Sequence, residues 1–407
     1  MGNEFLSLHF LQCTNLALPN LRVLRWERAA TSRRTLFPFD SITFLWPLLA
    51  PTIDTLEVAL SGTEDPKFQS FLDNYPQLYP NLKSIKLDFL RRCQVPASAS
   101  LALSQAICSN ADWQRVELSP TVDNVALKHL GTSSTLKVAS LTLAPEATQS
   151  DETWFGHADT PFRNVTRLAL TLENRLDFAT HLLRAHDQLF HDFKVLVRTQ
   201  PTAMEVSALL TAIASPQRMH SLQLLVIRQP PFYGISRPAS ERQRLSYETF
   251  RPLASLAHLC ELVINLNHTI SLDDDEFAGL VSNWPFLEVL WLMGMREEHP
   301  AKSITLKGLL SLLVSCQKLR EIGLSVDASG VPLEACTDAC CPSVTRLVFQ
   351  DSPITNSELV AEFLSKHLPC VRAVHAVFTR RPYGEGDRKH EQLWTRVNAW
   401  RKLPIGE

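Results

Sequence analysis

The chain has 407 residues, of which 45% are hydrophobic and 20% are charged. This composition is typical of a globular protein and excludes intrinsic disorder. Forty basic and 42 acidic side chains leave a net charge of −2, so the chain has no excess of positive charge for binding nucleic acid or an anionic membrane. It contains 64 leucines but only 13 glycines, and so few glycines argue against glycine-rich phosphate-binding loops.

The nine cysteines are scattered along the chain and odd in number. A secreted disulfide framework is denser and usually even in number, so we expect free thiols in a reduced compartment. The first residues lack the basic stretch and apolar core of a signal peptide, and no stretch approaches the 18 apolar residues of a membrane span. We therefore expect a cytoplasmic or nuclear protein.

One short pattern, with apolar residues at its positions 1, 4 and 6, recurs along the chain at a typical spacing of about 28 residues. Two of the copies match less well, because Arg198 and Ala376 stand at position 6. Each copy predicts a β-strand. In chain order the thirteen copies are Leu21/Leu24/Trp26, Ile53/Leu56/Val58, Leu82/Ile85/Leu87, Trp113/Val116/Leu118, Val138/Leu141/Leu143, Val165/Leu168/Leu170, Phe193/Leu196, Met219/Leu222/Leu224, Leu259/Leu262/Ile264, Leu287/Leu290/Leu292, Leu319/Ile322/Leu324, Val344/Leu347/Phe349 and Val371/Val374.

Helix-like segments lie between these runs, with apolar residues three and four apart, for example over residues 208–213, 306–313 and 359–364. A strand, a loop and a helix within about 30 residues form the leucine-rich-repeat arrangement, in which stacked repeats share one core. The sequence therefore predicts an α/β fold, a right-handed leucine-rich-repeat-like solenoid of horseshoe shape. Its parallel sheet forms the concave face and its helices the convex face. A conventional α/β domain, the alternative, would not repeat one register thirteen times.

We place about 13 irregular repeats in residues 1–378, followed by a linker and a C-terminal capping helix in residues 379–407. Within that helix Leu393, Val397 and Trp400 recur at helical spacing and form an apolar stripe. Such a stripe predicts that the helix covers the exposed end of the solenoid core.

The strand segments "LPNLRVL", "YPNLKSIKL", "WPFLEVLWL" and "CPSVTRLVF" resemble the repeat region of fungal F-box proteins with leucine-rich repeats. In that family an N-terminal F-box docks onto a Skp-type adaptor of a cullin ubiquitin ligase, and the repeats hold the substrate. The resemblance implies a ubiquitin-ligase substrate receptor. No F-box helices precede the first predicted strand at Leu21, so we expect the adaptor as a partner only if the F-box lies outside this sequence.

No sequence motif of a known catalytic or cofactor site occurs, so we expect neither an enzyme nor a bound cofactor. The cluster Cys336-x3-Cys340-Cys341 lacks the second ligand pair of a zinc site, and we expect buried thiols there. The acidic run 273–276 follows Ser271 at the start of a helical segment. It fits the first turn of a helix better than a metal site. An enzyme with an unrecognised site remains an alternative.

Positions 3 and 5 of each strand should point away from the core, onto the concave face. In the early repeats these positions are charged, whereas in the later ones they are mostly apolar. The predicted docking surface for a protein partner centres on Trp291, and its other members are Val195, Val197, Val263, Val289 and Val348. Tryptophan is enriched at interface hot spots, so the pattern favours a non-catalytic protein-interaction module. A scaffold or GTPase regulator unrelated to ubiquitination is the alternative.

Overall fold

The computed structural model describes residues 20–26, 50–60, 72, 79–89, 97–145, 161–173, 175–185, 190–215, 221–230, 244–295, 302–330, 339–377 and 385–400. The chain divides into two compact units, Met1–Glu173 and Asn174–Glu407, which we call the N-terminal and C-terminal units. The sequence pattern did not predict this division, because the same apolar repeat occurs on both sides of it.

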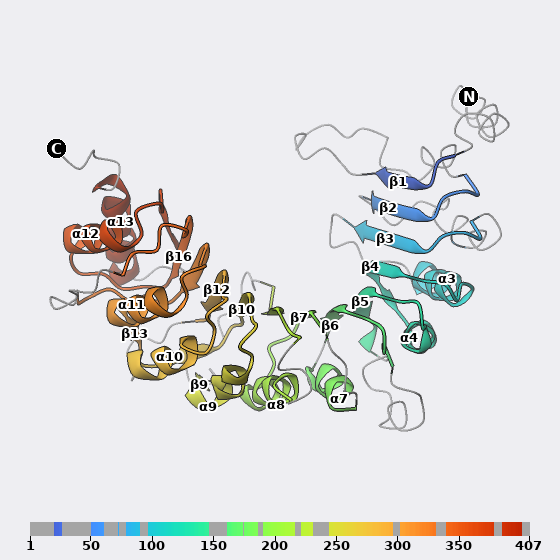
Figure 1. The fold of residues 1–407 in the computed structure, drawn as a ribbon, viewed down its shortest axis with the longest axis horizontal. Helices are drawn as coiled ribbons and strands as arrows, with labels where there is room; N and C mark the ends of the chain where they lie inside the picture. The colour runs from blue at the N-terminus through green and yellow to red at the C-terminus, as the bar shows by residue number, and fades with distance from the viewer. Residues whose placement is uncertain are drawn as a thin grey trace. The chain divides into compact units, whose positions relative to one another are not determined.

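The N-terminal unit contains six parallel strands that pair in chain order. Its described helices lie along one face of the sheet (Figure 1). The strands are β1 (Val23–Trp26), β2 (Thr55–Leu60), β3 (Ser84–Phe89), β4 (Arg115–Val122), β5 (Val138–Leu143) and β6 (Arg167–Leu172), and the helices are α3 (Ala97–Cys108) and α4 (Asn124–Thr132).

The C-terminal unit repeats this layout with seven parallel strands, again with helices along one face (Figure 1). The strands are β7 (Asp192–Val197), β8 (Leu224–Arg228), β10 (Glu261–Asn265), β12 (Val289–Met293), β14 (Glu321–Leu324), β16 (Arg346–Gln350) and β17 (Val374–Val377). The helices are α7 (Asp177–Ala185), α8 (Ala203–Ile213), α9 (Tyr247–Phe250), η6 (Arg251–Ser255), α10 (Asp274–Val281), α11 (Leu306–Ser315), α12 (Ser357–His367) and α13 (Glu385–Trp400). Two small parallel sheets pair β9 (Arg244–Ser246) with β11 (Thr269–Ser271), and β13 (Ile304–Thr305) with β15 (Val326–Asp327).

Each unit is therefore an α/β solenoid of the leucine-rich-repeat type, and this prediction is confirmed. The six and seven strands correspond to the thirteen predicted repeats. Positions 4 and 6 form the continuous core, because residues such as Leu56, Ile85 and Val116 lie side by side in register and are buried.

A backbone contact recurs where one repeat meets the next. The carbonyl at position 2 accepts hydrogen bonds from two successive N–H groups of the following repeat. Between β10 and β12, for example, Cys260 O accepts from Glu288 N at 2.7 Å and from Val289 N at 3.1 Å. The accepting carbonyls belong to Arg22, Asp54, Lys83, Gln114, Lys137, His191, Gln223, Cys260, Glu288 and Arg320. These shared acceptors fix the register of neighbouring strands before any side chain is considered.

The register of two repeats at the start of the C-terminal unit differs from the prediction by three residues. Phe193 pairs with Leu225, and Leu225 pairs with Leu262, so both Phe193 and Leu225 occupy position 4. The repeats are thus Phe190/Phe193/Val195 and Leu222/Leu225/Ile227, all buried. For the first of these repeats, the prediction began the pattern at Phe193 and so placed Phe190 outside the core, where the structure buries it. In the structure Phe190 packs 5.7 Å from Phe193, between ring centroids.

In the N-terminal unit the fifth predicted repeat is displaced by two residues. Ala139 lies beside Val116 and Leu168, so Ala139 occupies position 4 and Leu141 occupies position 6. The small side chain of Ala139 gave a weaker apolar signal than Val138, which explains the wrong frame.

The acidic run 273–276 begins α10, as predicted. Asp273 is its N-cap, and with Glu276 it forms a reciprocal capping box. Asp274 reaches further, to the start of α11 in the next repeat. Its carboxylate accepts hydrogen bonds from Thr305 N at 2.7 Å, Thr305 Oγ1 at 2.6 Å and Gly308 N at 3.0 Å. One aspartate therefore caps the helix of the neighbouring repeat and holds the two repeats together.

The Asp274 contact predicts that replacing Asp274 by alanine destabilises the protein much more than replacing its neighbour Asp275. Asp274→Ala removes the acceptor of Gly308 N in the first turn of α11 and of the Thr305 N–H and hydroxyl just before it, so the free energy of unfolding should fall by about 2 kcal/mol. Asp275→Ala is the matched control: its side chain is 91% exposed and reaches only Lys307, at 3.5 Å, so its loss should cost less than about 0.5 kcal/mol. Urea unfolding of both variants measures the difference, and equal losses would contradict the capping role.

Helix α13 packs on α12 and on β17, the last strand of the sheet. Its Trp394 is 1% exposed, donates from Nε1 to Ser352 O at 2.9 Å, and lies 5.1 Å from the Phe349 ring. Asn398 pairs with the backbone of Val374 in β17: its Oδ1 accepts from the N–H at 2.8 Å, and its Nδ2 donates to the carbonyl at 2.9 Å. The side-chain amide thus occupies two of the backbone groups that a further strand could use.

The predicted apolar stripe of this helix is partly wrong. Val397 is buried as expected, but Leu393 is only half-buried, and the side chain of Trp400 lies outside the described residues. Trp394 takes the central place instead. The prediction chose Leu393 because Leu393 and Trp394 are adjacent, and an apolar stripe that includes Val397 can be drawn through either residue.

We expect Trp394→Ala to destabilise the C-terminal unit by about 3–5 kcal/mol, because it removes a buried ring and leaves a cavity against Phe349. Arg396→Ala, on the exposed side of the same helix, should change stability by less than about 0.5 kcal/mol. Differential scanning calorimetry measures both. A Trp394→Ala protein that melts like the control would show that α13 does not support the core.

Candidate interaction surface on the open sheet face

In each unit the sheet face opposite the helices carries positions 3 and 5 of the repeats, and we call it the open face. In the N-terminal unit its charges pair with one another. Glu57 lies 3.1 Å from Arg25 and 3.7 Å from Arg115, while Glu117 lies 2.7 Å from Arg115 and 3.9 Å from Lys86. The hydrogen bond to Glu117 raises the pKa of Arg115. This face therefore satisfies its own charges.

The open face of the C-terminal unit has a different character. Val263, Trp291, Gly323 and Val348 lie side by side on β10, β12, β14 and β16, all at position 5. The predicted register is confirmed for these four residues. Val289 lies at position 3 on the same face, two residues before Trp291 in β12.

The Trp291 ring lies over Gly323. A Cβ atom at position 323 would be 3.0 Å from both Cγ and Cδ2 of the ring, so the glycine provides the space that the indole occupies. The guanidinium group of Arg346 lies 4.9 Å from the ring centroid, and that of Arg228 lies 5.9 Å from it. Two cations therefore flank the aromatic ring, at distances that favour cation–π attraction.

The indole N–H of Trp291 is buried and has no hydrogen-bond partner among the described residues. Native proteins pair most buried donors, and an unpaired one reduces stability. The open face thus contains a buried donor that none of the described residues satisfies.

The predicted members of this surface differ in how far they are accessible. Trp291 and Val289 are half-buried, whereas Val263 and Val348 are only 2% and 5% exposed. Adjacent strands lie about 4.8 Å apart, so large side chains cover their smaller neighbours. A partner would therefore touch Trp291, Val289 and the two arginines, with the valines beneath them.

Val195 and Val197 are not on the open face, and their assignment to the docking surface is wrong. Both are fully buried, because the three-residue shift in register turns them into the core. Asp192 and Lys194 take positions 3 and 5 of that repeat, and Leu224 and Val226 take them in the next.

The two arginines beside Trp291 were not among the predicted surface residues. Arg346 stands at position 3 of a correctly placed repeat, so its orientation could have been predicted. Arg228 lies on the open face only in the corrected register. There it follows Ile227 of position 6 and pairs with Asn265 of β10.

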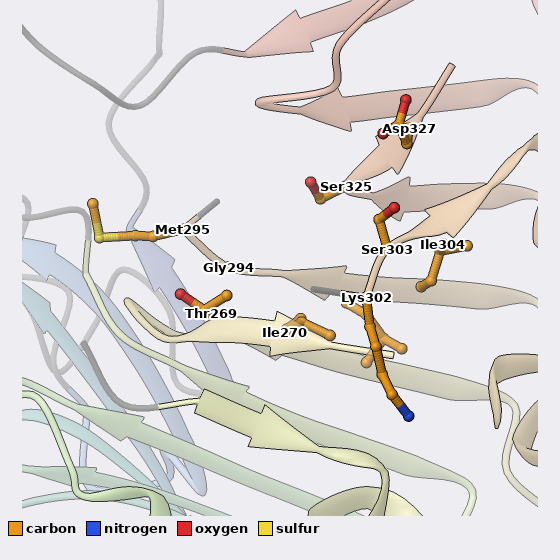
Figure 2. A pocket seen from close by; sticks show the side chains of 10 residues that line it. Thr269, Ile270, Gly294, Met295, Lys302, Ser303, Ile304, Ser325 and Asp327 are labelled. Carbon is orange, nitrogen blue, oxygen red and sulfur yellow. The ribbon is translucent and has the colours of Figure 1, made fainter. Parts of the chain in front are cut away.

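A small cavity lies beside β11, β12 and β13 (Figure 2). Its volume is about 30 Å³, and its lining includes Thr269, Lys302 and Asp327. This volume holds a water molecule, whereas small-molecule sites measure several hundred Å³. The buried Thr269 hydroxyl, which has no partner among the described residues, is a suitable contact for such a water.

A wider depression of about 520 Å³ lies at the start of α7 and α8. Its polar side chains are already paired: Arg175 lies 3.8 Å from Asp177, and Thr202 forms a capping box with Glu205. Nearby, His268 is fully buried, and neither ring nitrogen has a hydrogen bond of normal geometry to a described residue. Burial lowers the pKa of His268, against smaller opposing effects of the Pro201 carbonyl and Glu205.

Within the described ranges, no three histidine, cysteine or acidic side chains are placed to hold a metal ion. Cys341 is buried and Cys340 is exposed, while Cys336 lies outside the described residues. Burial raises the pKa of Cys316 to about 12, which keeps this thiol protonated and unreactive. In the part of the chain that the structure describes, no helix has the length and apolar character to span a membrane.

No protein-family model and no curated protein matches this chain. Among solved structures, the chain is similar to one from the crystal structure of the Rad7 and Elc1 complex in yeast. The two share 11% sequence identity with a TM-score of 0.47, and the match covers 84% of this chain and 81% of that one.

The structure predicts opposite effects for two adjacent residues of β12. Leu290 is fully buried at position 4, so Leu290→Ala should lower the free energy of unfolding by about 2–5 kcal/mol. Trp291 is half-buried on the open face, and Trp291→Ala should cost about 1 kcal/mol. Urea unfolding measures both. If Trp291→Ala unfolds the chain while Leu290→Ala has no effect, the open face has been assigned to the wrong side of the strand.

Proposed function

We propose that the protein is a non-catalytic protein-interaction module whose partner binds the open face of the C-terminal unit around Trp291. The observation that carries this proposal is the half-buried indole, held over Gly323 between Arg228 and Arg346. Tryptophan and arginine are the residues most often found at energetic hot spots of interfaces, surrounded by smaller contacts that exclude water.

The contrast between the two units supports this location. In the N-terminal unit Arg25, Glu57, Arg115 and Glu117 form ion pairs within the chain. The open face around Trp291 instead combines apolar side chains with an unpaired donor, and such a surface gains free energy when a partner covers it.

We further propose that the module is the substrate-recognition part of an F-box-type ubiquitin-ligase receptor. This finer proposal rests on the family resemblance of the strand segments, such as those that begin at Leu18 and Trp284. Under it, a Skp-type adaptor binds through an F-box encoded outside this sequence. Under the alternative, the same surface belongs to a scaffold or a GTPase regulator.

The test uses a photo-crosslinking amino acid in place of Val289, within the full chain. The matched control carries the same group in place of Val125, which is exposed on α4 away from the open face. We expect a protein crosslinked from position 289 and not from position 125. With that protein purified, Trp291→Ala should weaken its binding about thirtyfold, which corresponds to about 2 kcal/mol.

Equal crosslinking from both positions, or unchanged binding by a folded Trp291→Ala variant, would contradict the proposed surface. The finer proposal requires two further results: the full-length gene product binds a Skp-type adaptor, and the crosslinked protein is ubiquitinated in its presence. A crosslinked GTPase whose nucleotide turnover changes would support the alternative function.

A further inference from the structure

We infer that the partner presents an acidic peptide segment to this surface, with a carboxylate received by Arg228 and the indole N–H of Trp291. The inference rests on the proposed function and deepens it, since it names the chemistry of the partner. It follows from two groups, the Trp291 indole N–H and the nearby Arg228 guanidinium, that no described residue satisfies.

The first unsatisfied group is the Arg228 guanidinium. Three other arginines on the open faces have carboxylate partners, because Arg25 and Arg115 lie near Glu57 and Arg346 lies 3.2 Å from Glu321. Arg228 is exposed and has no ion pair with a described residue, although it lies 5.9 Å from the Trp291 ring. A guanidinium that binds a carboxylate in two places is a common recognition device.

The second unsatisfied group is the buried Nε1–H of Trp291. An indole nitrogen only donates, so whatever completes it must bring an acceptor. A carboxylate accepts at both oxygens and can receive the indole N–H and the guanidinium together. The side chains of Arg228 and Arg346 are long and exposed at the surface, so they can rotate to admit it.

The distribution of charge favours a carboxylate over a phosphate. Glu261 and Glu321 stand at position 3 of β10 and β14, toward the start of the strands, while Arg228 ends β8. A singly charged group near Arg228 meets a cation and keeps its distance from these glutamates. A doubly charged phosphate group is repelled more strongly by the same two carboxylates.

The probe is a fluorescein-labelled peptide of alternating glutamate and valine, and its binding to the full chain is measured by fluorescence anisotropy at low salt. We expect Arg228→Gln to weaken binding at least about tenfold. Arg228→Lys should recover part of the loss, because lysine keeps the charge but not the planar fork. The matched control is Arg115→Gln, an open-face arginine already paired with Glu117, which should leave binding unchanged.

Three outcomes overturn the inference. The wild-type chain does not bind the peptide, Arg115→Gln weakens binding as much as Arg228→Gln, or a matched phosphoserine peptide binds more tightly. A separate test addresses two acidic residues of the chain itself, Glu297 and Glu298, which follow β12 and lie outside the described residues. If replacing both with glutamine tightens peptide binding, these two acids compete with the peptide for the same site, which supports recognition of a carboxylate there.

The peptide result and the crosslinking result separate the two proposals. If the crosslink at position 289 forms and depends on Trp291 but the acidic peptide does not compete with it, only the acidic chemistry is wrong. If the crosslink itself is absent, the proposed function fails whatever the peptide does.

Discussion

Each repeat is joined to the next by one backbone carbonyl that accepts two N–H groups, and the rest of the fold depends on this contact. The carbonyls of Gln223, Cys260 and Glu288 illustrate it in three successive repeats. Because the bond involves only main-chain atoms, it tolerates almost any side chain at position 2. It decides which residues enter the core and which form the open face, and the position of Trp291 follows from it. Side-chain links such as that from Asp274 to Thr305 then reinforce a register already set by the backbone.

Most of the fold could be predicted from the sequence, since large apolar residues at positions 1, 4 and 6 identify the strands. The small side chain of Ala139 accounts for the exception in the N-terminal unit, and the two at the start of the C-terminal unit share another physical cause. Where a stretch contains more apolar residues than one frame needs, as in Phe190–Val197, two frames both place apolar residues at positions 1 and 4, and these two positions alone cannot choose between them. In the structure Phe190 is buried against Phe193. The spacing of apolar residues does not predict this contact. Val195 and Val197 were assigned to the wrong face for this reason.

The centre of the candidate surface could be predicted, but its chemistry could not. Trp291 stands in a repeat whose register is unambiguous, so its orientation followed from the pattern. The space beneath it depends on the absence of a side chain at Gly323, on the next strand, and the flanking cations come from Arg228 and Arg346 on two further strands. These residues are far apart in the sequence and adjacent only in the sheet. The sequence likewise does not predict that the indole nitrogen lacks a described hydrogen-bond partner, because this depends on the positions of all its neighbours.

Asn398 gives the solenoid a defined length. Stacked parallel strands form a surface on which another strand, from this chain or from a second molecule, could continue the sheet without limit. By offering one donor and one acceptor to Val374, the asparagine amide reproduces the hydrogen bonds of a strand while presenting no backbone edge of its own. Together with the packing of α13 on β17, this side chain ends a periodic architecture at a defined strand.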